Sequence, residues 1–198
     1  EIRAVLGDGL RYLTLHDFAG APNATEDADT FAGNATKKAL GLARWLAGQP
    51  RLDAAETTLV MADDSGLEVD ALNGAPGVVS ARFAALDTES SGNSTDADNT
   101  AKLLRLLRDV PSAKRTARFR CVIALARVGH ADTLRLFEGA CEGRILAEPR
   151  GTAGFGYDPV FQPLGHTESF AELGEAVKNR MSHRARALAR AARDICAP

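Results

Sequence analysis

The stretch Thr57-Thr-Leu-Val-Met-Ala62, which continues as Asp63-Asp-Ser-Gly66, decides the fold class of this chain. Its first part is a short apolar run of β type, the kind that is buried inside a sheet. Asp63-Asp-Ser-Gly66 is favourable turn chemistry, so we expect the strand to stop there. Leu67 and Val69 then alternate with acidic residues before a turn at Asn73-Gly74. The pattern predicts a buried strand followed by a polar turn.

Helical periodicity occurs on both sides of this strand. Before it, apolar residues recur at helical spacing, with Asp29 or Thr30 as the N-cap. After it, one helical stripe ends at Pro111 and another begins at Ser182. The members of the three stripes are Phe31, Ala35, Ala39, Leu42, Ala43 and Leu46; Leu103, Leu104, Leu107 and Val110; and Leu188, Ala192 and Ile195. The polar stretch Thr88–Thr100 is expected to be an exposed loop.

A second strand signal lies further along the chain. Apolar residues alternate with other residues at Ala117, Phe119, Cys121, Ile123 and Leu125. Residues 128–132 turn the chain toward another strand at Thr133–Cys141, so a hairpin is expected. Long strands with flanking helices predict an α/β fold with mixed rather than purely parallel pairing. We expect residues 1–198 to form a single domain.

The charge balance excludes several classes of protein. Of 198 residues, 24 are Lys or Arg and 26 are Asp or Glu, so the formal net charge is −2. Proteins that bind nucleic acid or anionic lipid usually carry a basic excess, so neither partner is expected. No run approaches the ~20 apolar residues of a membrane span. The first residues lack the basic start and apolar run of a signal peptide, so no export signal is expected. Cys121, Cys141 and Cys196 form no C-x-x-C pair, which indicates reduced thiols and a cytoplasmic protein.

The adjacent acids Asp63 and Asp64 are the strongest candidates for chemistry. They follow a buried strand, where α/β sheets commonly place ligands. Neighbouring carboxylates are costly to hold together unless a cation or a proton lies between them. Mg²⁺ usually takes one or two carboxylates together with substrate phosphate oxygens. The pattern therefore indicates a site for Mg²⁺ and phosphate, and a solvated turn at the end of the strand is the alternative.

Two later segments have the chemistry to bind a planar base. The loop Gly151-Thr-Ala-Gly-Phe-Gly-Tyr-Asp-Pro159 combines glycines, which permit close backbone approach, with Phe155 and Tyr157, which could stack on a base. Asp158 could accept hydrogen bonds from ring nitrogens. Residues 178–184 lead into a helix whose N-terminus would attract anions or polar base edges. The alternatives are a structural loop pinned by its aromatic residues and a solvated basic helix start.

Several short motifs occur in order along the chain. They are Glu26 with Thr30-Phe31, Asn34-Ala35 and Lys38-Ala39; Ala62-Asp-Asp-Ser-Gly-Leu67; Gly74-Ala-Pro-Gly77 with Ser80-Ala-Arg82-Phe83; Gly154-Phe-Gly-Tyr-Asp-Pro159; and Ser182-His-Arg184. Together, from about Glu26 to Arg184, they resemble the inosine triphosphate pyrophosphatase family. The resemblance implies an elongated, mixed and twisted sheet flanked by helices, with two lobes and a central substrate cleft. It also implies a homodimer.

The same resemblance implies an activity and roles for individual residues. Family members hydrolyse ITP, dITP and XTP to the monophosphate and pyrophosphate, which keeps deaminated purines out of nucleic acid. By resemblance, Asp64 is the catalytic carboxylate and proton acceptor. Glu26 and Asp64, with Asp63 close by, would hold Mg²⁺, the implied cofactor. The residues matched to substrate contacts are Ser65, Phe155, Gly156, Tyr157, Asp158, Lys178, His183 and Arg184.

The family begins with a strand and a loop of the type Ser/Thr-x-Asn-x-x-Lys, which grips the triphosphate. Asn34-Ala-Thr-Lys37 and Asn99-Thr-Ala-Lys102 have a similar spacing, but both lie in helical patterns and do not match that loop. The first strand and the phosphate loop are therefore expected to be missing before residue 1. Two alternative functions stay open: a non-catalytic nucleotide-binding homologue, and a pyrophosphatase for other modified nucleotides.

Overall fold

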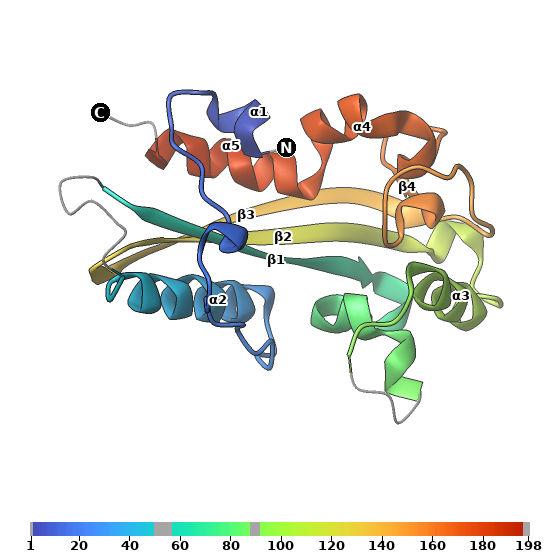
Figure 1. Ribbon diagram of the computed structural model, residues 1–198. Helices are drawn as coiled ribbons and strands as arrows, with labels where there is room; N and C mark the ends of the chain where they lie inside the picture. Colours follow the sequence, from blue (N-terminus) through green and yellow to red (C-terminus); the bar gives the residue numbers. More distant parts are fainter. Residues whose placement is uncertain (1, 50–56, 88–91, 196–198) are drawn as a thin grey trace. The chain divides into compact units, whose positions relative to one another are not determined.

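The structure is a computed structural model, and it describes residues 2–49, 57–87 and 92–195. The chain divides into two compact units. Unit 1 comprises Glu1–Asp64, Cys121–Glu138 and Ala187–Pro198, and unit 2 comprises Ser65–Arg120 and Gly139–Arg186. The helices and strands (Figure 1) are α1 (Ile2–Leu6), α2 (Phe31–Leu46), β1 (Leu59–Val69), α3 (Asp96–Leu106), β2 (Thr116–Arg127), β3 (His130–Ile145), β4 (Phe161–Pro163), α4 (Phe170–Met181) and α5 (His183–Ile195).

The strands form one sheet in the order β1-β2-β3-β4. Val128, just after β2, donates its N–H to the carbonyl oxygen of Thr58, just before β1, at 3.0 Å, so these two strands run in opposite directions. A short hairpin connection joins β2 to β3, and β3 pairs antiparallel with β4. The predicted α/β class, the long strand and the hairpin are confirmed. No parallel pair of the expected mixed sheet lies among the residues that the structure describes.

β1 does not stop at Asp63-Asp-Ser-Gly66, so this prediction from the sequence was wrong. The strand is continuous from Leu59 to Val69. On its outer side, the carbonyl oxygen of Asp63 accepts a hydrogen bond from Lys38 Nζ at 3.1 Å, and Leu67 N–H donates to Ser80 Oγ at 2.9 Å. Pairing with β2 and these side-chain partners satisfy the backbone, and they outweigh the local turn preference.

The polar stretch that was expected to be an exposed loop is partly helical. α3 begins at Asp96, and Thr95 acts as its N-cap by accepting a backbone N–H bond. Asn99 and Thr100 are buried. A threonine cap followed by acidic residues favours a helix start, so the composition that suggested a loop is that of a helix N-terminus. Residues 88–91 of this stretch lie outside the described residues.

The core of unit 1 has a helix on each face of the sheet. Figure 1 shows α2 on one face and α5 on the other. α2 buries the small residues Ala35 and Ala39, which let a helix approach a sheet closely. On the opposite face, Ile123 of β2 packs with Leu188 of α5. The strand segment that carries the two acids is therefore held between two packed helices.

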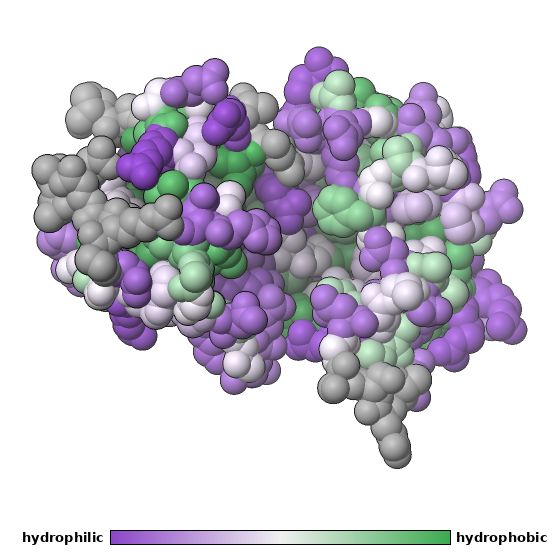
Figure 2. Space-filling view, in the orientation of Figure 1, coloured by the Kyte–Doolittle hydropathy of each residue, from purple (hydrophilic) through white to green (hydrophobic). Residues whose placement is uncertain are grey.

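Unit 1 also contains a cavity of about 720 Å³ beside the start of β1. Its walls are largely apolar and include Leu6, Leu10, Leu13, Leu42, Leu46, Leu59 and Val60. Figure 2 shows apolar surface among hydrophilic side chains in this part of the molecule. Among the described residues no carboxylate lines the cavity. It therefore lacks the ligands that a site for Mg²⁺ and phosphate requires.

The core of unit 2 is a cluster of aromatic side chains. The ring of Phe119 on β2 lies 4.6 Å from that of Phe161 on β4 and 6.0 Å from that of Phe170 on α4, centroid to centroid. β4 approaches β3 closely at Gly143, where a Cβ would overlap the carbonyl oxygen of Gln162 and the Phe161 ring. This packing holds α4 over one face of the sheet (Figure 1).

The cysteines bear on the expected redox state. Cys121 and Cys141 are buried thiols that form no disulfide within the described part of the chain. Burial raises the pKa of Cys141 to about 11, which makes its thiol a poor nucleophile. Cys196 lies outside the described residues. No helix in residues 2–49, 57–87 or 92–195 has the length and apolar character needed to cross a membrane.

Candidate active site

α2 presents two polar side chains, Asn34 and Lys38, one helical turn apart. Thr30 caps the helix, because its Oγ1 accepts a backbone N–H from the first turn at 3.0 Å. Residues four apart share a helix face, so both side chains reach β1. We use the name acidic cluster for the group that they form with Glu26 and Asp64. The cluster lies within unit 1.

Lys38 lies between the two carboxylates of the acidic cluster. Its Nζ is 2.7 Å from Glu26 Oε1 and 2.9 Å from Asp64 Oδ1. The other carboxylate oxygen of Asp64, Oδ2, accepts a hydrogen bond from Asn34 Nδ2 at 3.2 Å. Asp64 is buried, whereas Glu26 is exposed. The buried carboxylate is thus held at both of its oxygens by side chains from α2.

Burial and charge oppose each other in the acidic cluster. Burial is the largest influence on Asp64 and leaves its pKa above the ordinary value, although Lys38 and Asn34 act to lower it. Burial by itself would lower the pKa of Lys38, but the hydrogen bonds and charges of Glu26 and Asp64 outweigh it and leave that pKa raised. Lys38 therefore stays cationic at neutral pH, while Asp64 is a stronger base than an exposed aspartate.

Asp63 and Asp64 project to opposite faces of β1, because successive side chains of a strand alternate. Asp63 Oδ2 lies 3.8 Å from Cys121 Sγ, whereas the Asp64 carboxylate meets α2. Ser65 is half-buried and is placed by the same alternation on the face of Asp63. The structure thus brings Asp64 together with Glu26, and Asp63 contributes its backbone oxygen to Lys38.

The donors of the acidic cluster suit a hard divalent cation. Glu26 and Asp64 offer carboxylate oxygens, and the Lys38 ammonium shows that one positive charge can be shared between them. Mg²⁺ is commonly held by one or two carboxylates and completes its shell with water and phosphate oxygens. Within the described residues, no group of three or more His, Cys, Asp or Glu side chains is arranged to hold a metal. The acidic cluster itself offers two carboxylates, those of Glu26 and Asp64.

In unit 2, the buried carboxylate of Asp158 organises the loop Gly151–Pro159, which we call the aromatic loop. It accepts the N–H of Phe155 at 2.9 Å and forms an ion pair with Lys178 of α4. A Cβ at Gly154, where φ is +81°, would overlap this carboxylate, so glycine is required there. Lys178 Nζ also lies 4.3 Å from the centroid of the Phe155 ring, a cation–π contact.

The two aromatic residues of the aromatic loop differ in exposure. Phe155 is 60% exposed, whereas Tyr157 is only 4% exposed. The Tyr157 hydroxyl donates to the carbonyl oxygen of Ser80 at 2.9 Å, and burial raises the pKa of Tyr157. Both rings were candidates for stacking on a base. In the structure Phe155 offers an accessible face, and Tyr157 anchors the loop.

Gly156 is held by the N-terminal turn of α3. Its N–H donates to Asp96 Oδ2 at 2.6 Å, and its carbonyl oxygen lies 3.5 Å from Thr100 Oγ1. The sequence did not connect Gly156 with Asp96 and Thr100, because the polar composition of Thr88–Thr100 favoured an exposed loop there. A threonine followed by an acidic turn was the signal for the helix start that positions them.

The third predicted segment opens α5. Ser182 is its N-cap, as expected, and its Oγ accepts the N–H of Ala185 at 3.1 Å. His183 is buried and stacks on Phe119, with ring centroids 4.9 Å apart and an interplanar angle of 13°. Arg184 is half-buried. The structure thus gathers His183 with the aromatic core of unit 2, and substrate contact by His183 and Arg184 stays a prediction.

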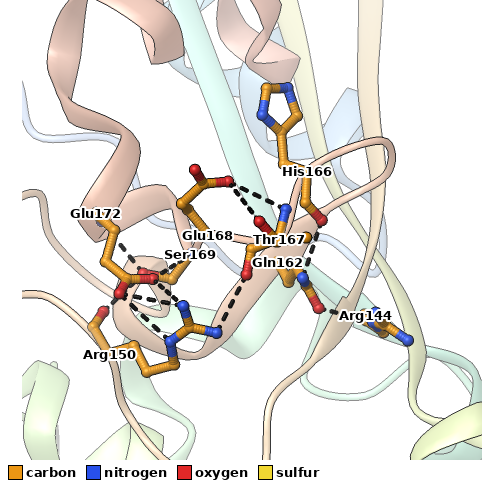
Figure 3. A network of polar contacts seen from close by, with 8 residues as sticks. All are labelled: Arg144, Arg150, Gln162, His166, Thr167, Glu168, Ser169 and Glu172. Atoms are coloured by element: carbon orange, nitrogen blue, oxygen red, sulfur yellow. Dashed lines mark hydrogen bonds and ion pairs between the residues drawn. The ribbon is translucent and has the colours of Figure 1, made fainter.

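A polar network anchors the N-terminus of α4, the helix that carries Lys178 (Figure 3). Ser169 and Glu172 form a capping box, in which each side chain bonds the backbone of the other residue. Arg150 pairs with Glu172 at 3.1 Å and donates to the carbonyl oxygen of Thr167 at 3.1 Å. The start of α4 is therefore fixed, and the helix is interrupted at Gly174, where φ is +74°, before it reaches Lys178.

Comparison with known proteins finds relatives along nearly the whole chain. A family model described as the Ham1 family matches residues 1–194. A dITP/XTP pyrophosphatase from Opitutus terrae is 51% identical over 183 residues, which are 92% of this chain and 82% of the relative. A dITP/XTP pyrophosphatase from Desulforamulus reducens is 48% identical over 185 residues, again 92% of this chain and 82% of the relative.

Solved structures are similar as well. A HAM1 protein from Coxiella burnetii matches with a TM-score of 0.83 at 35% identity and covers 98% of this chain and 90% of that one. The Ham1 protein of Staphylococcus aureus matches with a TM-score of 0.74 at 32% identity, over 91% of this chain and 84% of that one. The chain therefore belongs to the Ham1 family, which confirms the resemblance read from its motifs.

Proposed function

We propose that this protein hydrolyses the deaminated purine nucleoside triphosphates ITP, dITP and XTP to the monophosphate and pyrophosphate. The observation that carries the proposal is the buried Asp64 carboxylate, each of whose oxygens has a polar partner, with Lys38 linking it to Glu26. The chain is also 51% identical to a dITP/XTP pyrophosphatase. Such an activity would remove damaged purines from the nucleotide pool before they enter nucleic acid.

Asp64 is the proposed proton acceptor. Hydrolysis between the α- and β-phosphates needs a water that is oriented and deprotonated during attack. A carboxylate fixed at both oxygens is already oriented, so less ordering is required at the moment of reaction. Burial raises the pKa of Asp64, which makes it a better base than a solvated aspartate.

We propose that Glu26 and Asp64 hold Mg²⁺ and that activity depends on it. When bound, the metal would neutralise charge on the phosphates and on the leaving pyrophosphate. Lys38 supports this assignment, because its ammonium already interacts with both carboxylates. The chain's own contribution is to keep the Asp64 carboxylate in one place through Asn34 and Lys38.

The aromatic loop is the proposed base-recognition element. Inosine and xanthine carry a 6-oxo acceptor where adenine carries an amino donor. Lys178 supplies N–H donors beside the exposed face of Phe155, on which a purine ring could stack. An adenine would leave such donors without an acceptor, and sites built for hydrogen bonding reject such mismatches strongly.

A substrate panel tests the proposal. The purified protein is given dITP, XTP, ITP, dATP and dGTP with Mg²⁺, and pyrophosphate release is followed as phosphate after coupled hydrolysis. We expect turnover of the deaminated purines to exceed that of dATP by at least about 10²-fold, and EDTA to abolish it. Turnover of dATP equal to that of dITP would overturn the proposed base selection. Calorimetric binding of dITP without turnover would indicate the non-catalytic alternative, and preference for a modified pyrimidine the other one.

We further propose a homodimer that works in the cytoplasm. The support is the family resemblance, together with buried thiols at Cys121 and Cys141 that form no disulfide within the described chain. Size-exclusion chromatography with light scattering should give a mass near twice the 20.9 kDa of one chain. A mass of one chain at all concentrations would contradict the dimer.

A further inference from the structure

Asn34 occupies a special place in the acidic cluster, because it is fully buried and bonded on both sides of its amide. Its Oδ1 accepts the N–H of Ala28 at 2.9 Å, and its Nδ2 donates to Asp64 Oδ2 at 3.2 Å. The amide oxygen is committed to a backbone donor, so the NH₂ group must face the carboxylate. Asn34 thus provides a hydrogen bond to Asp64 without adding a positive charge.

The other side of the amide controls the segment that carries Glu26. Ala28 lies two residues after Glu26 and two before Thr30, the N-cap of α2. Ala28 is half-buried, and its backbone N–H finds its acceptor in the Asn34 side chain. A single side chain therefore joins this segment to the Asp64 carboxylate.

We propose that Asn34 is a positioning residue of the acidic cluster: it sets the Asp64 carboxylate and the Glu26 segment so that the two acids can share one cation. Lys38 occupies Asp64 Oδ1 and Glu26 Oε1, and Asn34 holds the remaining oxygen of Asp64. Hydrogen bonds to metal-ligating carboxylates typically change metal affinity or activity by 10–100-fold when removed. The inference rests on the proposed function.

Unit 2 contains a matched control, Asn99 of α3. It is 2% exposed, its Oδ1 accepts the N–H of Ala84 at 2.8 Å, and its Nδ2 donates at 3.1 Å. The acceptor in this case is the backbone oxygen of Ala81 rather than a carboxylate. Replacing either asparagine by alanine therefore removes two side-chain hydrogen bonds, but only the replacement of Asn34 removes one to an acid.

The first experiment measures kcat, the KM for dITP and the Mg²⁺ concentration for half-maximal rate in Asn34→Ala and Asn99→Ala. We expect Asn34→Ala to lower kcat or to raise the Mg²⁺ requirement by about 10–100-fold. Its KM for dITP at saturating Mg²⁺ should stay within about threefold of the wild-type value, because base contacts are untouched. At saturating dITP, Asn99→Ala should leave kcat and the Mg²⁺ requirement within about threefold of the wild-type values. Its KM for dITP is not used as a control, because the same turn of α3 holds the aromatic loop. Equal effects of the two variants would overturn the proposal.

The second experiment measures folding instead of activity, by urea unfolding without metal. Asn34→Asp keeps an oxygen that accepts from Ala28, but its second carboxylate oxygen faces the Asp64 carboxylate. The two like charges repel each other, so the variant should be less stable than the wild type. Adding Asp64→Asn reverses donor and acceptor and restores the hydrogen bond. The unfolding equilibrium constant of the double variant should be about tenfold lower than that of Asn34→Asp alone. Its kcat should stay at the level of Asp64→Asn alone.

Asn99→Asp is the control for the swap. It also sets a carboxylate against an acceptor, the carbonyl oxygen of Ala81, yet Asp64→Asn should not rescue it. If Asp64→Asn fails to rescue Asn34→Asp, or rescues both variants equally, Asn34 does not position Asp64. The unfolding data decide this even for a protein without turnover of dITP. An inactive wild type would instead overturn the proposed function.

Discussion

The N-terminal turns of α2 and α3 are built from the same parts but serve different ends. Each helix is capped by a threonine, Thr30 or Thr95, and carries a buried asparagine four residues later. Both asparagines accept a backbone N–H from the segment that precedes the helix. Asn34 then donates to the Asp64 carboxylate, whereas Asn99 donates to a backbone oxygen. The two turns share the same local structure, and the group that accepts the asparagine N–H distinguishes the candidate active site from a structural support.

A lysine further along each helix differs in the same way. Lys38 is shared by Glu26 and the buried Asp64, whose side chain is 8% exposed. Lys102 binds Asp87, whose side chain is 50% exposed, at 2.7 Å and the backbone oxygen of Phe83 at 2.7 Å. Water screens an exposed pair and weakens it, while a buried carboxylate depends on its partners. The comparison teaches that burial of the Asp64 carboxylate distinguishes the candidate active site beside α2 from the exposed ion pair beside α3.

The largest expected effect comes from the acids themselves. Asp64→Asn should lower kcat for dITP by about 10²–10⁴-fold, because it removes the proposed proton acceptor. Asp87→Asn, the matched change beside α3, should leave kcat within about threefold of wild type. Pyrophosphate release gives both values, and circular dichroism confirms folding. Full activity in Asp64→Asn would show that another group accepts the proton.

The lysines should separate activity from stability. Lys38→Met leaves the buried Asp64 carboxylate without its ammonium partner, so it should lower the free energy of unfolding by about 1.5–3 kcal/mol. Lys102→Met should have a smaller effect, because water screens its pair with the exposed Asp87. Lys38→Met should also lower kcat about 10–100-fold, because Asp64 loses a partner that orients it. Urea unfolding and steady-state rates measure the two quantities. A comparable loss of kcat in Lys102→Met would erase the distinction between the turns.

A smaller effect is expected in the pH dependence of stability. Burial raises the pKa of Asp64, whereas the hydrogen bond from Lys102 lowers the pKa of Asp87. With a raised folded-state pKa, the folded protein binds the extra proton, so the Asp64 contribution falls as pH rises from 3.8 through that pKa. With a lowered pKa, the Asp87 contribution is present above 3.8 and is lost as pH falls through its folded-state value.

Urea unfolding in metal-free buffer across this acidic range measures the two signs. Relative to wild type, Asp64→Asn should become more stable as pH rises, because it lacks the cost of ionising a buried acid. Asp87→Asn should become less stable over the same range, because it lacks a favourable ionised partner. Two curves of the same slope would contradict the contrast between a buried and an exposed acid.

Much of the fold was predictable because local signals were strong. The alternation from Ala117 to Leu125 predicted β2, since only a strand repeats every two residues. Ser182 predicted the start of α5, and the pair of candidate caps Asp29 and Thr30 predicted the start of α2, where Thr30 is the cap. Such side chains satisfy backbone donors that no helix can satisfy itself. These features depend on neighbours in sequence, so the sequence suffices to find them.

The failures occurred where distant partners overrode local preference. Asp63-Asp-Ser-Gly66 is good turn chemistry, yet β2 and the side chain of Lys38 hold it as a strand. Thr88–Thr100 is polar enough for a loop, yet Thr95 starts a helix in it. At the aromatic loop, the sequence offered two rings, and packing against Ser80 buried one of them.

The sequence by itself determined the family, the alternation of β2, the caps that begin α2 and α5, and the residue types of the candidate site, because motifs and periodicities are properties of neighbouring residues. Only the tertiary structure decided which of the two adjacent acids meets Glu26. A paired strand turns successive side chains to opposite faces, so the Asp64 carboxylate reaches α2, whereas the Asp63 carboxylate lies beside Cys121 of β2. The partnership of Asn34 with Asp64, thirty residues apart, likewise exists only once α2 lies on the sheet.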